Sequence, residues 1–436
     1  MFFHGLFNLV DLLIVGPLGP YALAAVNQAS LVNMLPMVIA AGVNNASIAL
    51  ISRNFGMRNY NRANANALQS FLLLAVLAVA LGWPSYAYAP ELNRLVGSEG
   101  DALVEANAYL RISSAGLITM FVLMQVTAVL RAGGNARWPM VLMIGANLLN
   151  VGLTIALVFG WWHFPRLGVA GAAWGTVIAR GIFAVFGLWL ITRPAAPVRL
   201  ILRRPRPRGR MIWNLTRIGI PSSMQFVVRV IAYGALMRYV VEFGDGEAMH
   251  AALAAGLRLD MLATFAGAGW GAAAAAIVGQ ALGARLHRRA ERAGWLAAIL
   301  NALMMTAIGL AYWWHARWLM EVFGDDPGVR PEFRLMSDYG TEFLRIAVVG
   351  YAFAGIGITL AQALNGAGST KMPLLLDSFG FLLLLIPAAA HIAHHHEERG
   401  YGRATLWWVV VGVSALVAVL YVVVWAVGHW KHKRIQ

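Results

Sequence analysis

Long apolar runs separated by short polar stretches follow one another along the whole chain. Each run is about 20 residues long, which is the length an α-helix needs to cross the roughly 30 Å hydrocarbon layer of a bilayer. We therefore predict an all-α polytopic membrane protein with about twelve transmembrane helices. The first predicted span is short for a membrane crossing. The predicted spans cover residues 1–16, 22–51, 66–86, 107–130, 138–159, 168–191, 212–241, 249–280, 294–319, 338–364, 373–393 and 407–430.

The composition excludes a soluble enzyme. The chain has 436 residues, of which 60% are hydrophobic and 12% are charged. An ordinary soluble domain has roughly 25% charged residues, about twice the fraction found here. The chain contains no cysteine, so neither disulfides nor thiolate chemistry can contribute to its function.

The net charge of +15 is explained by membrane topology rather than by nucleic-acid binding. When the connections between spans are numbered alternately, one side of the membrane receives 21 basic residues and the other side six. Basic residues are enriched in cytoplasmic loops of membrane proteins. We therefore expect a multi-pass protein of the cell (inner) membrane. The long loop after the sixth span and the C-terminus would be cytoplasmic, and no nucleic-acid partner is expected.

The two halves of the chain are related by an internal repeat. Two blocks recur, the first after the second and eighth spans at an offset of 227 residues, the second in the fourth and tenth spans at an offset of 234. Six spans per repeat make both halves enter the membrane in the same direction. We predict two six-helix lobes, residues 1–192 and 212–436, joined by a basic linker at 193–211 and related by a pseudo-two-fold axis along the membrane normal. The first block pairs Gly56, Arg58, Arg62 and Ala63 with Gly283, Arg285, Arg289 and Ala290, and the second pairs Arg111, Gly116, Gly134 and Pro139 with Arg345, Gly350, Gly368 and Pro373.

Several separated segments resemble signatures of the MATE (multidrug and toxic compound extrusion) family, and they occur in the family's order. They are residues 8–25, the paired Gly-x-Arg turns of the repeat, 167–176 and 364–373. The resemblance extends from about residue 3 to the last helix. It implies a two-lobed antiporter that exports small organic compounds, often cationic, in exchange for protons or sodium ions. It also implies no enzymatic activity and no cofactor beyond the coupling ion, and we expect a monomer.

Asp11 is the carboxylate of the N-terminal lobe that lies well inside a predicted span. An ionised carboxylate at the membrane centre costs at least about 2.5–3.5 kcal/mol unless it faces water or has polar partners. Burial favours the neutral acid, so such a group can bind and release a proton during transport. Asn8 lies three residues earlier, on roughly the same helix face. A structural Asp11, satisfied by neighbouring Asn and Thr side chains, is the alternative.

Partners for Asp11 are expected on the fifth and sixth spans. Asn147, Asn150 and Thr154 form one stripe along the fifth span. In archaeal and DinF-like MATE proteins the resemblance implies a cation site of a first-helix Asp, a fifth-helix Asn, an Asp four residues later and a sixth-helix Thr. Asp11, Asn150 and Thr176 match these positions, whereas Thr154 replaces the second Asp. Because sodium prefers several oxygen ligands, we favour proton coupling, with sodium coupling and purely interhelical hydrogen bonding of the asparagines as alternatives.

The C-terminal lobe departs from the NorM-like branch, so the chain resembles the DinF-like type more closely. Arg229 occupies a position where NorM-like proteins have a glutamate, and the tenth span contains no acidic residue. Arg229 could pair with Asp260 or Asp377. Aromatic faces attract organic cations and Met side chains adapt their shape, whereas arginines inside spans leave room for anionic cargo. The expected substrate cavity consists of Met120, Met124, Gln225, Phe226, Arg229, Tyr233, Asp260 and Gln362.

Other functions receive less support. The sequence contains no Walker motif and no HExxH pair, so ATP-driven transport and proteolysis by those motifs are not indicated. The histidines at 391 and 394–396 are expected to form a solvated loop rather than a metal site. Export or flipping of a lipid-linked or amphipathic precursor, as in the related flippase superfamily, is the alternative to multidrug efflux.

Overall fold

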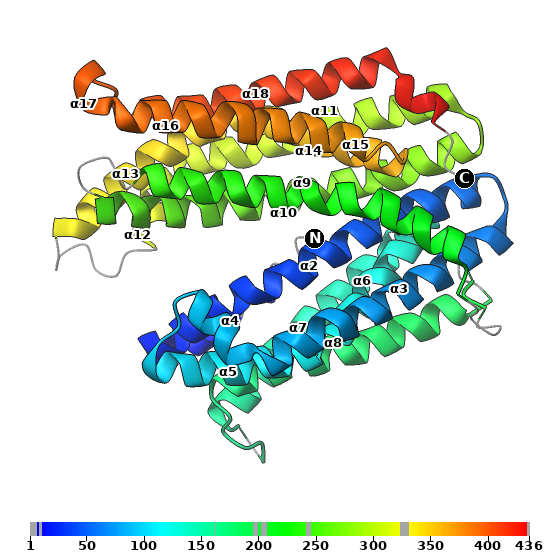
Figure 1. Cartoon of the computed structure of the whole chain (residues 1–436), viewed down its shortest axis with the longest axis horizontal. Helices are drawn as coiled ribbons and strands as arrows, with labels where there is room; N and C mark the ends of the chain where they lie inside the picture. Colours follow the sequence, from blue (N-terminus) through cyan, green and yellow to red (C-terminus); the bar gives the residue numbers. More distant parts are fainter. Residues whose placement is uncertain are drawn as a thin grey trace. The chain divides into compact units, whose positions relative to one another are not determined.

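In the computed structural model, all regular secondary structure of the described residues is helical (Figure 1). The residues described are 7, 11–161, 163–194, 199–201, 207–240, 246–322 and 331–433. The first half contains η1 (Gly16–Leu18), α2 (Pro20–Gly56), α3 (Tyr60–Ala87), α4 (Ala89–Leu95), α5 (Gly100–Ala115), α6 (Leu117–Ala132), α7 (Arg137–Phe159) and α8 (Val169–Thr192). The second half contains α9 (Gly209–Val240), α10 (Gly246–Gly283), α11 (His287–Trp314), α12 (Ala316–Glu321), α13 (Pro331–Ala347), η2 (Val348–Gly350), α14 (Tyr351–Gly366), α15 (Lys371–Asp377), η3 (Ser378–Leu385), α16 (Ile386–His394), α17 (His396–Arg399), α18 (Arg403–Val427) and η4 (His429–His432).

The helices confirm the prediction of a polytopic membrane protein. Among the described residues, 10 helical segments are long and apolar enough to cross a membrane, and the bent pair α5–α6 raises this number to 11. These segments correspond to the second to twelfth predicted spans. Most of the first predicted span lies outside the described residues. Several helices extend past the predicted limits, because backbone hydrogen bonding continues after the apolar run has ended.

Three of the spans are interrupted, which the hydrophobic pattern did not predict. The fourth span bends by 48° between α5 and α6, at Gly116. The tenth span is broken by the short 3-10 segment η2 between α13 and α14. The eleventh span changes to a π-helix over η3, between α15 and α16. Such breaks are frequent at functional sites, because they free backbone groups or reorient side chains.

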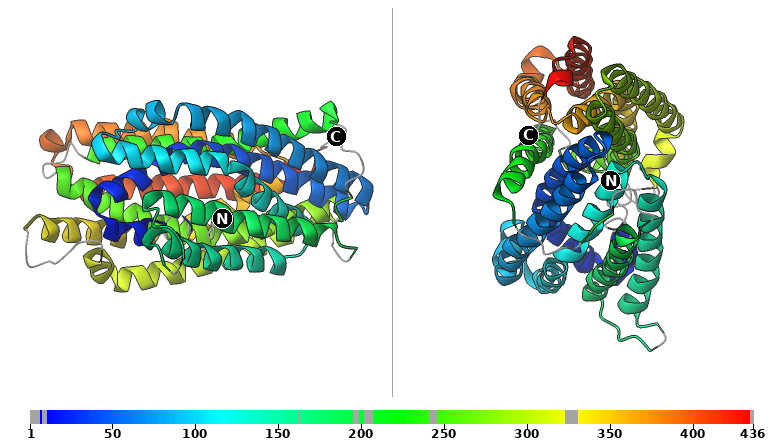
Figure 2. Two further views of the ribbon diagram at one scale, coloured as in Figure 1. Left: turned by 90° about the horizontal axis from the view of Figure 1, so that it is seen from below. Right: turned by 90° about the vertical axis from the view of Figure 1, so that its right-hand side faces the viewer.

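The chain divides into two compact units. The first contains Met1–Ser223 with Gly279–Leu286 and the last two residues, and the second contains Met224–Val278 and His287–Arg434. Each unit is a bundle of long helices that run side by side (Figure 2). The division falls within α9 and near the end of α10. The predicted lobes, 1–192 and 212–436 with a linker at 193–211, are defined by the chain repeat and stay a prediction.

Both units bury clusters of apolar side chains and expose others. In the first unit Phe121, Leu123 and Leu142 are fully buried, and in the second Leu253 and Leu344 are. Many large apolar side chains are instead exposed on the outer faces of long helices, where lipid tails would cover them. Examples are Val79, Val185, Leu303 and Leu383, each exposed by about two thirds.

The turns of the first repeated block have the same backbone geometry in both halves. Arg58 and Arg285 have positive φ angles of 55° and 61°, which are uncommon for residues other than glycine. The amide of Arg58 donates to the Phe55 carbonyl at 2.9 Å, and the amide of Arg285 donates to the Leu282 carbonyl at 3.1 Å. The offset of 227 residues therefore marks a structural repeat as well as a sequence repeat.

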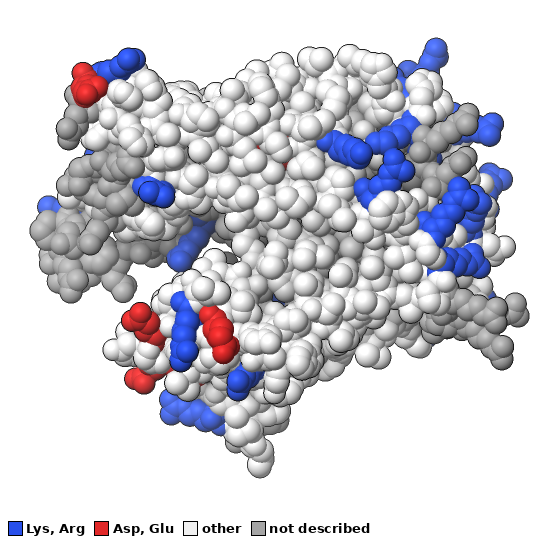
Figure 3. Space-filling model, in the orientation of Figure 1, with Lys and Arg blue, Asp and Glu red and all other residues white. Residues whose placement is uncertain are grey.

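Acidic side chains of the first unit gather at one end of its helices, over α4 and α5 (Figure 3). Glu91 lies in the first turn of α4 and Asp101 in the first turn of α5. Arg62 instead lies in the first turn of α3, and Arg58 lies in the turn just before it, at the opposite end of that long helix. The acidic side chains of this unit thus gather at one end, where Arg94 of α4 also lies.

Candidate functional site

Two glycines of α8 bring it into close contact with α7. A Cβ atom at Gly171 would lie 2.6 Å from the Leu157 carbonyl carbon, and one at Gly175 would lie 2.9 Å from the Thr154 backbone nitrogen. Small residues spaced four apart allow such close approach between membrane helices. The close packing brings the polar side chains of α7 within hydrogen-bond distance of those on α8.

Asp11 lies at the centre of a buried polar cluster in the first unit. Its side chain is 1% exposed. The Tyr109 hydroxyl group donates to Oδ2 at 2.9 Å, and the Thr176 hydroxyl group lies 3.0 Å from Oδ2 and 3.1 Å from Oδ1. A buried carboxylate needs such donors, because the bilayer interior offers no water to replace them. The partners come from α5 and α8, so the cluster joins helices that are distant in sequence.

Asn150 and Thr154 extend the cluster along α7. The Asn150 amide nitrogen lies 2.9 Å from Thr176 Oγ1 and 3.0 Å from Thr154 Oγ1. Asn150 and Thr154 are both fully buried. The Asn150 Oδ1 atom is also buried and has no hydrogen-bond partner among the described residues. The cluster therefore contains an acceptor oxygen that is available to a proton donor or to a cation.

The structure thus gathers four of the six residues that we predicted for cation coupling: Asp11, Asn150, Thr154 and Thr176. Asn147 is buried on the same helix, and its amide donates to the Met143 carbonyl at 2.8 Å. Asn8 lies outside the described residues. The roles of all six in coupling stay a prediction.

Two further residues of the cluster were missed by the sequence analysis. Tyr109 lies near the start of the fourth predicted span, where tyrosines commonly act as interfacial anchors. Arg180 lies one helical turn after Thr176, on the same face of α8 that carries the Asp11 partner. Its guanidinium lies 4.4 Å from the centre of the Phe7 ring. An arginine inside a predicted span is as strong a signal as an aspartate, so Arg180 could have been found by the same rule.

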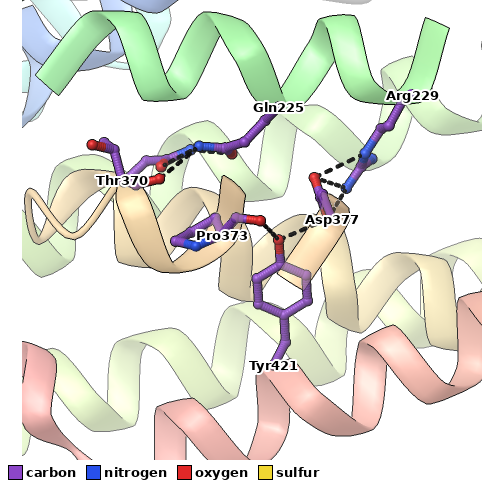
Figure 4. Close-up of polar contacts among 7 residues, drawn as sticks. Gln225, Arg229, Thr370, Pro373, Asp377 and Tyr421 are labelled. Atoms are coloured by element: carbon purple, nitrogen blue, oxygen red, sulfur yellow. Dashed lines mark hydrogen bonds and ion pairs between the residues drawn. The ribbon is translucent and has the colours of Figure 1, made fainter. Parts of the chain in front are cut away.

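In the second unit, Arg229 pairs with Asp377 rather than with Asp260. The Arg229 guanidinium lies 3.1 Å from Asp377 Oδ2, and the Tyr421 hydroxyl group donates to Asp377 Oδ1 at 2.8 Å (Figure 4). Asp377 is the last residue of α15, directly before the π-helical segment η3. The pair joins α9, α15 and α18, and it neutralises both charges inside the bundle.

The other residues predicted to line a cavity have varied surroundings. Gln225 exchanges two hydrogen bonds with Asn365, at 3.2 and 3.1 Å, and its amide also donates to the Thr370 carbonyl (Figure 4). Phe226 is 36% exposed on the same helix. Gln362 packs against Gly271. Met120 and Met124 are buried in a core cluster with Phe121 and neighbouring residues of α2 and α3.

Within the described residues, no three His, Asp or Glu side chains converge as a metal site requires. The polar clusters of both units are instead hydroxyl, amide and carboxylate networks between helices. Buried ionisable groups inside a bundle of membrane-spanning helices are typical of membrane transporters.

Comparison with known proteins identifies the family. Residues 1–156 and 221–390 match the MatE family, and the chain belongs to it. MatE proteins are membrane transporters rather than enzymes, and the chain is a homologue of multidrug efflux transporters. This confirms the resemblance that the repeated turns and the first-helix segment indicated.

Relatives and solved structures agree with this assignment. The chain is 25% identical to the probable multidrug resistance protein YpnP of Bacillus subtilis over 98% of its own length and 91% of that protein. It is also 25% identical to a FAD transporter of Shewanella oneidensis, covering 88% of this chain and 83% of the relative. A MOP superfamily transporter from Pyrococcus furiosus has the same fold, with a TM-score of 0.89 and 24% identity over 98% of this chain and 92% of that one.

Proposed function

We propose that the protein is a secondary active antiporter that exports organic compounds, many of them cationic, in exchange for protons. Membership of the MatE family supports transport of such compounds. The observation that carries the coupling mechanism is the Asp11 carboxylate, which is buried and held by donors from two other helices. A carboxyl group in this position can alternate between a charged state that accepts hydrogen bonds and a neutral state that accepts them less strongly.

The cluster favours a proton over a sodium ion as the coupling ion. Thr154 supplies a neutral hydroxyl group where the resemblance implies a second carboxylate. Arg180 lies one helical turn after Thr176 on the same face of α8, where its positive charge would compensate part of the negative charge of Asp11. This guanidinium opposes the binding of either cation, but a proton needs only the carboxylate, whereas a sodium ion also needs several further oxygen ligands. Sodium coupling through Asp11 and the Asn150 carbonyl oxygen is the competing proposal.

Protonation of Asp11 is the proposed trigger for transport. A neutral carboxyl group is a weaker acceptor, and its own proton must find a partner, so the hydrogen bonds from Tyr109 and Thr176 rearrange. This rearrangement would favour the state that opens toward the cytoplasm and would weaken cargo binding. Loss of the proton to the cytoplasm then restores the hydrogen bonds around the ionised carboxylate.

Transport by purified protein in proteoliposomes tests this proposal. We impose a proton gradient across the vesicle membrane in the absence of sodium. We expect wild type to move ethidium, rhodamine 6G or norfloxacin in the direction opposite to the flow of protons. Asp11→Asn should abolish this transport, because the amide cannot exchange a proton, whereas Asp101→Asn on the exposed start of α5 should not. Proton-driven transport that persists in Asp11→Asn would contradict the coupling role. Transport that requires sodium instead would favour the competing ion.

We further propose that the segment between α8 and α9 faces the cytoplasm. The uneven distribution of basic residues supports this orientation. Because the chain has no cysteine, single cysteines can be introduced without background labelling. A cysteine at Arg199 should be protected from an impermeant maleimide in intact cells, whereas one at Glu91 should react. The reverse pattern would invert the proposed topology.

An exporter or flippase of an anionic amphipathic compound is the second candidate. Arg238 and Arg258 have exposed side chains on predicted spans, where a lipid-linked phosphate could reach them. One relative is a FAD transporter, and FAD is an anionic dinucleotide. Export of an anionic dye, lost on replacement of both arginines by glutamine, would favour this candidate over export of cations.

A further inference from the structure

A cavity of the second unit is lined by residues that belong to neither polar cluster. Its volume is about 390 Å³, and it lies where α12 contacts α13, near one end of the helices (Figure 1). The lining side chains are Arg317, Asp338, Thr341, Glu342, Arg345 and Ile346. Small-molecule sites in proteins typically have volumes of about 300–1,000 Å³. The cavity is therefore large enough for a small ligand, and both cations and anions face it.

Two of the four charges in the cavity are paired with neighbouring residues. Arg317 Nε lies 3.0 Å from Glu321 Oε1, one helical turn away on α12. Glu342 Oε2 lies 3.7 Å from Arg403 Nε, so α18 supplies the partner on that side. One carboxylate and one guanidinium of the lining remain.

These remaining charges are Asp338 and Arg345, and neither has an ion-pair partner within the described part of the chain. They lie seven residues apart, two turns along α13, and both side chains are exposed. The Arg345 guanidinium lies 5.7 Å from the centre of the Trp313 ring, a contact that orients the arginine but does not neutralise its charge. The cavity thus presents one negative and one positive group to the same ligand.

The internal repeat shows that the fold itself does not require this set of charges. The contact between Arg345 and Trp313 has an equivalent in the first unit. At the offsets of the repeat, the Arg111 guanidinium lies 5.8 Å from the centre of the Tyr86 ring. The aromatic contact therefore belongs to the shared scaffold, whereas the mixed charges are specific to the second unit. The repeat equivalents of Arg317, Asp338 and Glu342 are the uncharged residues Pro90, Val104 and Ala108.

Exposed tryptophans indicate that the cavity lies at the level of the lipid headgroups. The candidate membrane span α11 ends at Trp314, which is 77% exposed. Trp318 on α12 is 62% exposed. Tryptophans at the ends of spans lie at the interface between hydrocarbon and water, where the polar groups of lipids also lie. A phospholipid headgroup can therefore reach the cavity from the bilayer.

We propose that the cavity binds a phosphoethanolamine group, with Asp338 binding its ammonium group and Arg345 its phosphate. A primary ammonium group donates several hydrogen bonds, and a guanidinium can donate paired hydrogen bonds to a phosphate. A ligand of a single charge sign is disfavoured, because one of the two residues would repel it. The tryptophans favour the headgroup of a membrane lipid over a free molecule as the source of this group. The proposal does not depend on the export function or on Asp11.

Lipid binding to the purified full-length protein in detergent, measured by native mass spectrometry, tests the proposal. The probes are the dioleoyl forms of phosphatidylethanolamine, phosphatidylcholine and phosphatidylglycerol. We expect the first to bind about fivefold more tightly than the other two, because phosphatidylcholine has no N–H donor and phosphatidylglycerol has no cation. Asp338→Asn and Arg345→Gln should each lower the affinity for phosphatidylethanolamine about fivefold, whereas Asp338→Glu should keep most of it.

Arg111→Gln is the matched control, because Arg111 is the repeat equivalent of Arg345 and should not affect binding. Displacement of the lipid by free phosphoethanolamine would show that the headgroup alone is recognised, whereas binding that resists displacement would assign the site to the lipid. Equal affinities for phosphatidylethanolamine and phosphatidylcholine in wild type would overturn the proposal. So would a preference that persists in both variants of the cavity, or an equal loss in Arg111→Gln, which would indicate nonspecific attraction by surface charge.

Discussion

The Thr176 hydroxyl group lies 3.0 Å from Asp11 Oδ2 and 2.9 Å from the amide nitrogen of Asn150. A hydroxyl group has one proton, and the Asn150 nitrogen can only donate. Thr176 therefore accepts from Asn150 and donates to Asp11. The direction of the hydrogen bonds is fixed from α7 through α8 to the carboxylate, as long as the carboxylate is ionised.

Thr176→Val removes this relay, the two hydrogen bonds that link Asn150 through Thr176 to Asp11, with little change in side-chain volume. A hydrogen bond to a charged group contributes about 1.5–3 kcal/mol, so the ionised form of Asp11 becomes less stable and releases its proton less readily. We expect the rate of proton-driven dye export to fall roughly tenfold. Thr154→Val is the matched comparison and should reduce export less, because Thr154 contacts Asn150 rather than Asp11. Equal rates in wild type and Thr176→Val would show that the relay is dispensable.

Arg180→Met tests the electrostatic role of the guanidinium beside Asp11. A nearby positive charge stabilises the ionised carboxylate, so its removal favours the protonated form. The external pH at which export is half-maximal should then rise, by roughly one unit. Arg180→Lys should shift it less, because the charge is kept. A pH profile that does not move, or that moves to lower pH, would remove Arg180 from the coupling cluster.

Gly175→Ala tests the close packing that assembles the cluster. The added methyl group would meet the Thr154 hydroxyl group and backbone, which cannot move away without displacing α7. Overpacking of this kind typically costs about 1–3 kcal/mol. We expect a lower Tm by intrinsic fluorescence together with reduced export.

Gly152→Ala on α7 is the control for this substitution, because nothing lies within 4 Å of its added Cβ atom. Alanine also has the higher helix propensity, so this variant should be at least as stable as wild type. A Gly175→Ala protein with the Tm and export rate of wild type would show that α7 and α8 need not pack this closely.

Single and double substitutions test how each charge of the Arg229–Asp377 ion pair contributes to stability. Asp377→Asn leaves the Arg229 guanidinium in the bundle without a counter-charge. Because the Arg229 side chain is 29% exposed, the loss should be roughly 2 kcal/mol, below the value for a fully buried pair. Adding Arg229→Met to Asp377→Asn should restore part of the Tm. A double variant less stable than Asp377→Asn would mean that the arginine has a further partner.

The sequence predicted the polar residues of the Asp11 cluster because charges and amides are rare and costly inside a span. Asp11, Asn150, Thr154 and Thr176 all stand out against apolar neighbours. Arg180 stands out equally as a charged residue inside a span, so the same rule identifies it. Tyr109 could not be found in this way, since a phenol near a span end has an ordinary interfacial role. The hydrogen-bond partners of each residue also depend on helix packing, which periodicity does not encode.

The sequence predicted the membrane-spanning helices but not the interruptions within three of them. The apolar runs indicated the spans because their length matches the bilayer. The breaks at Gly116 and Gly350 fall on matching positions of the second repeated block, so the repeat contained a hint of them. The π-helical segment had no such signal. Its sequence from Ser378 to Leu385 is almost wholly apolar, and a π-helix differs from an α-helix only in backbone hydrogen bonding.

The repeated turns predict a reciprocal effect of two glycine substitutions. A Cβ atom at Gly56 would overlap the Gln280 carbonyl oxygen, and one at Gly283 would overlap the Arg53 carbonyl oxygen. Gly56 and Gly283 are equivalent in the repeat, and so are Arg53 and Gln280. The ends of α2 and α10 therefore each need a glycine where they contact one another. Gly56→Val and Gly283→Val should therefore reduce export to a similar extent. Gly412→Val, where nothing lies within 4 Å of the added Cβ atom, is the control. Strong loss in one variant and none in the other, at equal amounts of membrane-inserted protein, would show that the two contacts are not functionally equivalent.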